Sequence, residues 1–281
     1  MTIGLSERQA LAPTVVSRAA PRRLTGRQLT LVSWAAPVAI LALWEVASRA
    51  GLITPQVLPA PSSVAATAGK LIASGDLPKH LGASLARAAA GFAIGGTLGF
   101  GLGILVGFSR LAEALLDRSI QMIRAIPFLA LLPLVIVWFG VDESGKIFLV
   151  SLAVMFPIYI NTVLGVRQVD PKLLELARVT GLSRLETVRR IILPGAMPSI
   201  LTGVRYALAT AWLALVIAET IATTRGIGFL AMDAREFLQT NVIVLTILIY
   251  ALIGVAADGA ARALERGLLA WHPNYAKEGR K

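Results

Sequence analysis

Long apolar stretches without charge recur along the chain and alternate with short segments that carry the charged residues. A helix needs about 20 apolar residues to cross a bilayer core of about 30 Å. Only the fifth stretch carries charges, with Arg205 near its start and Glu219 near its end. The pattern predicts an all-α membrane protein with six transmembrane helices, over residues 28–44, 88–109, 125–141, 147–166, 199–220 and 240–257.

Composition supports a bilayer as the solvent. Hydrophobic residues make up 56% of the chain and charged residues 15%, whereas soluble domains carry about 25% charged residues. The net charge of +11 does not indicate nucleic-acid binding, because the Lys and Arg residues lie in short blocks between apolar runs instead of on one soluble face. With no cysteine and two distant histidines, His80 and His272, the chain offers no pattern for a metal site or a catalytic site.

The basic residues predict the orientation. If the N-terminus is cytoplasmic, eighteen Lys and Arg residues fall in inside segments and six in outside segments, which is the positive-inside bias of membrane proteins. Both termini are then cytoplasmic. The first apolar stretch has the basic flank of a signal peptide, but Glu45 and Arg49 follow it instead of a small-residue cleavage site, so we expect an uncleaved anchor. We expect a disordered cytoplasmic tail over residues 1–28, a membrane domain over 29–265 and a cytoplasmic tail over 266–281.

Glycines recur at every fourth position of the second predicted span. At 3.6 residues per turn they form one stripe without side chains, which allows another helix to approach closely. Gly is also generally tolerated in membrane helices, but this regular spacing favours tight packing. The stripe consists of Gly91, Gly95, Gly99, Gly103 and Gly107.

The loop between the fourth and fifth spans, residues 168–195, has clear helix signals. Asp170-Pro171 is an N-cap followed by proline at the first helical position, and Gly181 is the residue type expected just after a helix end. Ser183 and Glu186 form a capping box that opens a second helix.

The second helix of the loop is predicted to end at Pro194, and Pro198 fits the start of the fifth span. Leu185, Val188 and Ile192 are spaced to share one face of it. Two short amphipathic helices joined at a glycine suit a docking element for another protein. The pattern suits equally a helix that lies on the lipid surface.

The loop resembles the EAA motif of ABC importer permeases, which decides between these two interpretations. Glu175-Leu176-Ala177 is followed after three residues by Gly181, and nine further residues lead to Ile191-Ile192-Leu193-Pro194. Leu176 is the one departure, where the motif prefers Ala. The resemblance implies that the loop forms coupling helices that sit in a groove of an ATP-hydrolysing subunit. The residues that match the motif are Glu175, Ala177, Gly181, Ile191, Leu193 and Pro194.

Residues 58–275 resemble the permeases of bacterial aliphatic-sulfonate importers, in the group that includes taurine and nitrate permeases. The stretches that carry the resemblance are 120–133 (IQMIRAIPFLALLP), 137–149 (VWFGVDESGKIFL), 156–161 (FPIYIN) and 226–241 (GIGFLAMDAREFLQTN). The resemblance implies a type I ABC importer permease fold, in the bacterial inner membrane, that imports a small organic anion.

Several partners follow from this resemblance. The chain lacks a G-x-x-x-x-G-K-[ST] sequence, so we expect no cofactor in the chain itself, and ATP and Mg to be bound by partner ATPases. Its size implies a homodimer with the path at the two-fold axis. The resemblance adds two ATP-binding cassette subunits and a periplasmic or lipid-anchored substrate-binding protein. Specificity for the sulfonate, taurine, nitrate or another solute would rest mainly on the binding protein.

Ionisable and polar residues in or beside the spans are candidates for the path. Arg124 either offers positive charge to an anion or snorkels to the interface. Glu219 either pairs with Arg225 or Arg235 or helps to shape a gate. Gln121, Tyr159 and Asn161 are polar candidates for a lined cavity.

Two other functional classes fit the sequence less well. A secondary transporter would show broken helices in two repeated halves with buried acidic residues, and it would give the EAA-like loop no role. A membrane enzyme would need a constellation of metal ligands or a nucleophile that the sequence lacks.

Overall fold

The computed structural model describes residues 26–220 and 223–272, which form helices and turns without a strand. Two short π-helical turns, Glu113–Asp117 and Val188–Ile192, are inserted between α-helices. The α-helices are α1 (Gly26–Arg49), α2 (Pro61–Ala73), α3 (Asp76–Phe108), α4 (Arg110–Ala112), α5 (Arg118–Arg124), α6 (Phe128–Phe139), α7 (Glu143–Arg167), α8 (Pro171–Val179), α9 (Arg184–Thr187), α10 (Leu193–Glu219), α11 (Ile227–Glu236) and α12 (Thr240–Leu268).

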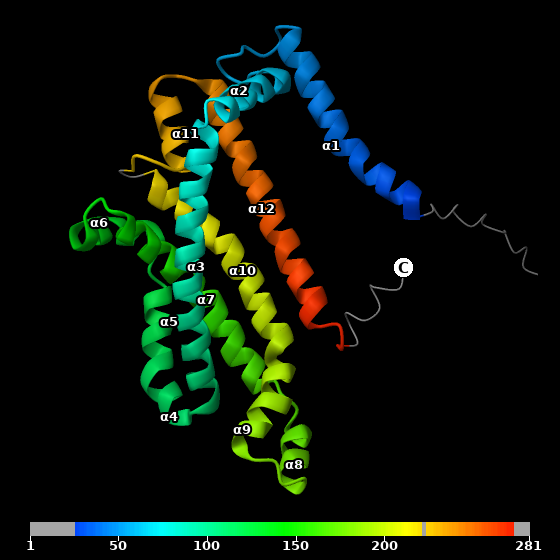
Figure 1. Ribbon diagram of the computed structural model, residues 1–281, viewed down its shortest axis with the longest axis vertical. Helices are drawn as coiled ribbons and strands as arrows, with labels where there is room; N and C mark the ends of the chain where they lie inside the picture. Colours follow the sequence, from blue (N-terminus) through cyan, green and yellow to red (C-terminus); the bar gives the residue numbers. More distant parts are fainter. Residues whose placement is uncertain (1–25, 221–222, 273–281) are drawn as a thin grey trace, which may run out of the picture.

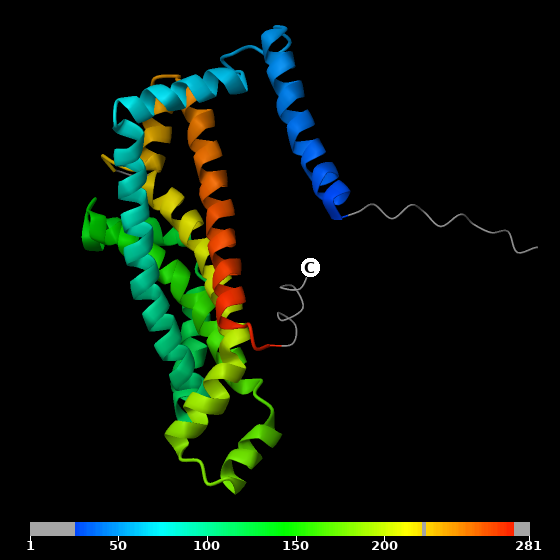
Figure 2. The same cartoon turned by 45° about the vertical axis from the view of Figure 1, so that its right-hand side comes forward.

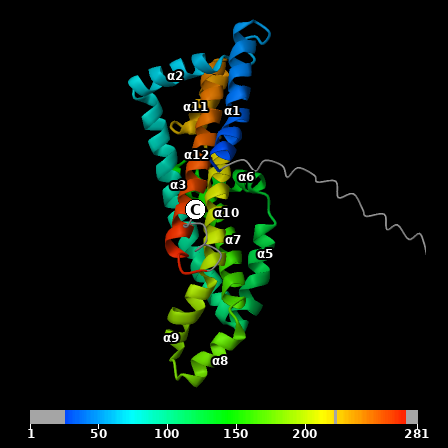
Figure 3. The ribbon, with the colours of Figure 1, turned by 90° about the vertical axis from the view of Figure 1, so that its right-hand side faces the viewer.

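The long helices α3, α7, α10 and α12 run along the long axis of the molecule (Figure 1). Helix α7 contacts both α3 and α10, and α12 packs on α10 and α11. Helices α8 and α9 project at one end, while α2 lies across the opposite end (Figures 2 and 3). Helix α1 stands apart from this body and meets α2, where the Ser62 Oγ donates to Glu45 Oε1 at 2.7 Å.

Four helical runs of the described residues are long and apolar enough to cross a membrane: Asp76–Phe108, Glu143–Arg167, Arg184–Glu219 and Thr240–Leu268. A bent pair, Arg110–Arg124 with Leu129–Phe139, makes a fifth if it counts as one span. The all-α membrane architecture is confirmed by these helices. The predicted number of six remains a prediction.

The predicted span over residues 125–141 is not one continuous helix. Helix α6 has 12 residues, or about 18 Å at 1.5 Å per residue, too short for a bilayer core. The two helices of the bent pair meet at 104°. Pro127 is extended, with ψ at 135°; it has no N–H to donate, and it disfavours helical geometry in the residue before it. The uncharged stretch 125–141 begins within this break, directly after Arg124, and hydropathy alone therefore did not reveal it.

The glycine stripe lies in the interface between α3 and α7. Gly91, Gly95, Gly99 and Gly103 are buried. A Cβ on Gly91 would lie 2.5 Å from Val150, one on Gly103 2.6 Å from Thr162, and one on Gly107 2.9 Å from Val166. On Gly95 and Gly99 it would overlap backbone atoms of α7. The two helices therefore pack backbone to backbone over several turns, as small residues allow in membranes.

The predicted tails fall partly outside the described residues. The N-terminal tail is predicted over residues 1–28, of which 1–25 lie outside the described residues. The C-terminal tail is predicted over residues 266–281, of which 273–281 lie outside them. Helix α1 already begins at Gly26, and α12 continues to Leu268, which lies within the second predicted tail.

Candidate functional site

The loop between α7 and α10 forms a pair of short helices at one end of the molecule (Figure 3). The side chain of Asp170 caps α8 by accepting the Lys172 N–H at 2.9 Å. Gly181 has φ +72°, in the left-handed region that favours glycine. The capping box is present: Ser183 Oγ accepts the Glu186 N–H at 3.3 Å, and Glu186 Oε2 accepts the Ser183 N–H at 3.1 Å. Local sequence signals thus set the shape of this loop.

The sequence predicts that the second helix of the loop ends at Pro194. The structure shows that it continues past this residue. Helix α9, the π-helical turn Val188–Ile192 and α10 form one helical run, Arg184–Glu219. In the π-helical turn, the Leu193 N–H bonds to the Val188 carbonyl, five residues earlier. Such a bulge shifts the backbone hydrogen bonds next to Pro194 from partners four residues earlier to partners five residues earlier. The nitrogen of Pro194 itself has no hydrogen to donate. The proline is therefore accommodated within the run.

The π-helical turn also changes which side chains share a face. Ile192 is 9% exposed and packs with Val166, Val169 and Ala196, whereas Leu185 is 77% exposed. Val188 packs against the same cluster as Ile192, as predicted, but the exposed Leu185 does not join them, so the predicted face is confirmed only for Val188 and Ile192. A bulge of this kind rotates the residues on its two sides relative to one another.

Apolar side chains are exposed at the tip of the loop. We call them the apical patch; its members are Leu173, Leu176, Val179 and Leu185, which are between 45% and 86% exposed. Contiguous exposed apolar surface beside polar groups is typical of a protein-interaction site. Glu175 is exposed beside the patch, and Ala177 is 1% exposed and turned inward. Ile191, Leu193 and Pro194 are half-buried where the loop meets α10.

A buried charge cluster lies toward the opposite end, where α3, α7, α10 and α11 meet. The side chain of Arg87 is 4% exposed and that of Glu219 is 0% exposed. Arg87 Nη1 donates to Glu219 Oε1 and to the Arg225 carbonyl, both at 2.6 Å. Its Nε and Nη2 donate to the two carboxylate oxygens of Glu143. Lys146 adds a contact to Glu143 at 3.3 Å. Each buried charge therefore has a partner, which a low-dielectric site requires.

The predicted pairing of Glu219 with Arg225 or Arg235 is wrong. The partner is Arg87, 132 residues earlier, while Arg225 contributes its backbone carbonyl. Sequence reasoning did not assign Arg87 a role. The available signal was a lone arginine at the end of the glycine-rich apolar stretch, because a charge in such a place needs a partner.

The five path candidates lie on three helices, α5, α7 and α10. Gln121 is half-buried and Arg124 exposed, both on α5, far along the chain from Glu219. Tyr159 is 1% exposed, and its hydroxyl donates to Asp117 Oδ1 at 2.6 Å. The backbone carbonyl of Asn161 accepts from Ser199 Oγ at 2.9 Å, between α7 and α10.

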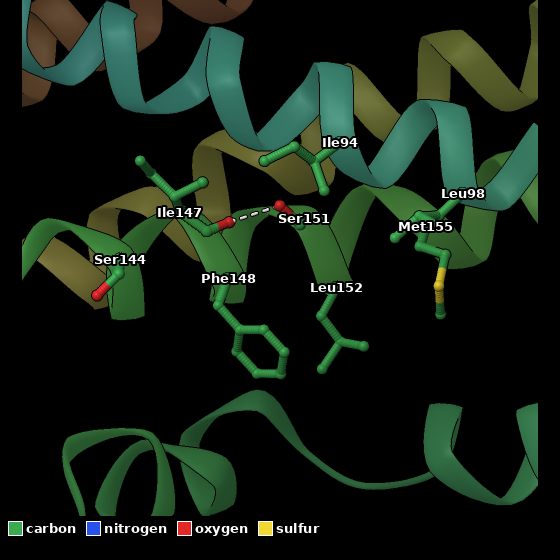
Figure 4. Close-up of a pocket in the computed structure, with 8 residues that line it drawn as sticks. All are labelled: Ile94, Leu98, Ser144, Ile147, Phe148, Ser151, Leu152 and Met155. Atoms are coloured by element: carbon green, nitrogen blue, oxygen red, sulfur yellow. Dashed lines mark hydrogen bonds between the residues drawn. The ribbon is translucent and has the colours of Figure 1, made fainter. Parts of the chain in front are cut away.

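Besides a cavity of about 590 Å³ that Arg87, Glu143 and Arg225 line at the charge cluster, two cavities show what the described chain offers a ligand. One of about 430 Å³ lies beside α3 and α7, and the only polar groups among its lining side chains are two serine hydroxyls (Figure 4). One of these, Ser151, donates to the Ile147 carbonyl at 2.7 Å. A second cavity, of about 800 Å³, lies between α10 and α12 and contains Arg205, Asp258 and Glu265. Two carboxylates against one guanidinium do not favour an anion there. The first cavity is lined by Ile94, Leu98, Ser144, Ile147, Phe148, Ser151, Leu152 and Met155.

A family model described as "Binding-protein-dependent transport system inner membrane component" matches residues 97–270. This range includes the loop with the apical patch and all of α10. The chain belongs to this family. It is a permease subunit of an ABC importer, a transport component of the inner membrane and not an enzyme. The family membership excludes the two other functional classes considered for the sequence, a secondary transporter and a membrane enzyme.

Relatives of this permease match nearly the whole chain. The putative aliphatic sulfonates transport permease protein of Escherichia coli (strain K12) is 53% identical, covering 88% of this chain and 94% of the relative. The protein of the same description from Bacillus subtilis (strain 168) is 46% identical, covering 85% and 87%. The taurine transport system permease protein of Escherichia coli (strain K12) is 38% identical, covering 88% and 91%.

A solved structure described as inward-facing conformations of the MetNI methionine ABC transporter shares the fold of this permease. Its TM-score is 0.51 at 20% identity, and the match covers 64% of this chain and 92% of that chain. The predicted importer fold is thereby confirmed.

Proposed function

We propose that this permease imports aliphatic sulfonates into the cytoplasm. The observation that carries the substrate class is the order of identities, at 53% and 46% to two putative aliphatic sulfonate permeases and 38% to a taurine permease. The charge cluster and the two cavities do not form a ready anion site in a single copy. We therefore assign the first selection of substrate to a periplasmic or lipid-anchored binding protein.

We propose further that two copies of the chain form the translocation path at a two-fold axis. Closed two-fold dimers are the commonest homo-oligomers. Gln121, Arg124, Tyr159, Asn161 and Glu219 remain our candidates for the path or its gate, with the exposed Arg124 as the residue that offers charge to an anion.

Two ATP-binding cassette subunits, which bind ATP and Mg, supply the energy. The apical patch supports docking on such a subunit, because its four apolar side chains are exposed and belong to helices at a protruding end. Glu175, Ala177, Gly181, Ile191, Leu193 and Pro194 define the coupling element, with Glu175 facing the partner. Both termini and this loop are cytoplasmic in our proposal, as the distribution of basic residues favours.

Growth on defined sulfur sources tests the substrate. A strain that lacks the permease should fail to grow on alkanesulfonates as sole sulfur source and should grow normally on sulfate. Reintroduction of the gene should restore growth. Normal growth on alkanesulfonates, with a defect on taurine, nitrate or another solute, would move the assignment within the family.

A further inference from the structure

One helical run connects the two ends of the molecule. The run Arg184–Glu219 begins in the loop that carries the apical patch and continues through the π-helical turn into α10. It has 36 residues, or about 54 Å at 1.5 Å per residue. The last residue of the run is Glu219. One unbroken helical run therefore connects the loop that carries the apical patch to the Glu219 carboxylate at the other end (Figure 1).

The carboxylate of Glu219 caps another helix. Helix α11 has no side-chain cap of its own, and the first N–H groups of any helix need acceptors. The Gly228 N–H donates to Glu219 Oε2 at 2.9 Å. The Ile227 N–H donates to Ser84 Oγ at 2.9 Å, and that hydroxyl donates to Glu219 at 2.7 Å. A negative charge at a helix N-terminus is also favourable toward the helix dipole.

The backbone of α11 fits closely against this carboxylate. A Cβ on Gly226 would lie 2.5 Å from the Glu219 carboxyl carbon, and one on Gly228 would lie 2.5 Å from the Glu219 Cβ. Gly226 also has φ +129°, a conformation that residues with a Cβ rarely adopt. The two glycines of Gly226-Ile227-Gly228 therefore let the end of α10 and the start of α11 touch directly.

We propose that Glu219 and Arg87 are positioning residues for transport. Together they make α11 move with the helical run Arg184–Glu219. Arg87 holds the Glu219 carboxylate in place through their direct contact at 2.6 Å, because a buried charge without its partner is strongly disfavoured. The carboxylate in turn holds the N-terminus of α11. This inference rests on the proposed function, in which the loop docks on an ATPase, and α11 lies toward the end of the molecule opposite that loop.

Introduced thiols can report the position of α11, since the chain has no cysteine. Ala234 in α11 is 0% exposed and Ala211 in the core of α7 and α10 is 3% exposed. Cysteine at either position should be protected from maleimide in the full complex of permease dimer, ATPase subunits and binding protein. Glu219→Gln removes the charge and nearly preserves the shape. Glu236→Gln, on the exposed end of α11, is the matched control.

With Glu219→Gln, we expect the thiol at position 234 to react at least about tenfold faster, because breaking a buried charged pair is costly. The thiol at position 211 should stay protected and the complex should retain its ATPase. Binding-protein-stimulated hydrolysis and uptake should both fall by about tenfold or more. Glu236→Gln should behave as the unmodified chain. Gly228→Ala, whose added Cβ would meet the Cβ and backbone of Glu219 without removing its charge, should reproduce the same set of changes.

Three outcomes would overturn the inference. In the first, position 234 stays protected and stimulation stays normal in both variants. In the second, both thiols react and the complex melts at a lower temperature, which would give the cluster a purely structural role. In the third, position 234 becomes reactive while stimulation and uptake remain normal, which would separate α11 from transport. Absence of any stimulation in the unmodified complex would instead contradict the proposed function, and the thiol reactivities would still decide whether Glu219 holds α11.

Discussion

Gly95 of α3 lies directly against the backbone carbonyl of Ser151 in α7, and a Cβ added to Gly95 would overlap that oxygen. Backbone atoms cannot rotate away as a flexible side chain can. The contact therefore fixes the separation of the two helices that form the centre of the fold.

Gly95→Ala should destabilise the permease by about 1–3 kcal/mol, the usual cost of overpacking a tight interface. The measurement is the thermal unfolding of the purified protein in detergent. Gly101→Ala is the matched control, since nothing lies within 4 Å of a Cβ at that position of the same helix. It should leave stability unchanged or raise it by about 1 kcal/mol through helix propensity. If Gly95→Ala and the unmodified protein unfolded at the same temperature, the result would contradict backbone-to-backbone packing.

Local features of the loop could be predicted because short-range chemistry determines them. Asp170 and the capping box of Ser183 and Glu186 depend on residues a few positions apart, and both are present. The glycine stripe likewise needs only a repeat within one helix. Long hydrophobic runs predicted α3, α7, α10 and α12, since burial in lipid requires them.

Features that depend on distant contacts could not be predicted. The partner of Glu219 lies on α3, and no spacing in the sequence connects Arg87 to it. The bend before α6 and the continuity through Pro194 show a second difficulty. Pro127 lies in a break between two helices, whereas Pro194 lies within a helical run, although both lie in apolar surroundings. The difference arises from a π-helical turn, whose extra residue leaves no mark in the hydrophobic pattern.

Gly181→Asp should uncouple the permease from its ATPase. A side chain at φ +72° costs about 1 kcal/mol or more, and the added charge would meet the docking surface. We expect normal membrane insertion, loss of binding-protein-stimulated hydrolysis and uptake, and loss of the ATPase during purification. Gly181→Ala should be milder because it adds no charge.

Gly51→Asp separates the backbone effect from docking. Gly51 has the same φ of +72° and the same open surroundings as Gly181, but it lies between α1 and α2 at the other end of the molecule. This variant should retain the ATPase and the stimulated hydrolysis. Full stimulation and retention in Gly181→Asp would contradict the docking role of the loop.

Glu175→Lys should also reduce stimulated hydrolysis, by reversing a charge on the exposed surface beside the apical patch. Like-charge contact at an interface slows association, so the defect should lessen as the ATPase concentration is raised. Glu236→Lys, an exposed glutamate at the opposite end, is the control. A Glu175→Lys complex with normal stimulation at limiting ATPase would remove Glu175 from the interface.

Arg124→Gln should depress sulfonate uptake while the complex still assembles, if the exposed guanidinium attracts the anion. Arg124→Lys should retain part of the uptake, because a point charge remains although the planar fork is lost. Arg118→Gln, at the start of the same helix, controls for general loss of positive charge on α5. Unchanged uptake in Arg124→Gln would leave snorkelling to the interface as its role.

Labelling of single cysteines should establish the orientation. Val179 in the apical patch and Leu52 between α1 and α2 are 86% and 80% exposed and lie at opposite ends of the molecule. Each can carry the only cysteine, because the chain has none. The excess of basic residues around the loop predicts that it lies in the cytoplasm. A membrane-impermeant maleimide should therefore label Leu52→Cys in intact spheroplasts, and Val179→Cys only after lysis. The permease is expressed without its ATPase, so that the apical patch stays uncovered and both positions can react in lysed cells. Labelling of Val179→Cys from outside would reverse the orientation and remove the loop from the ATPase.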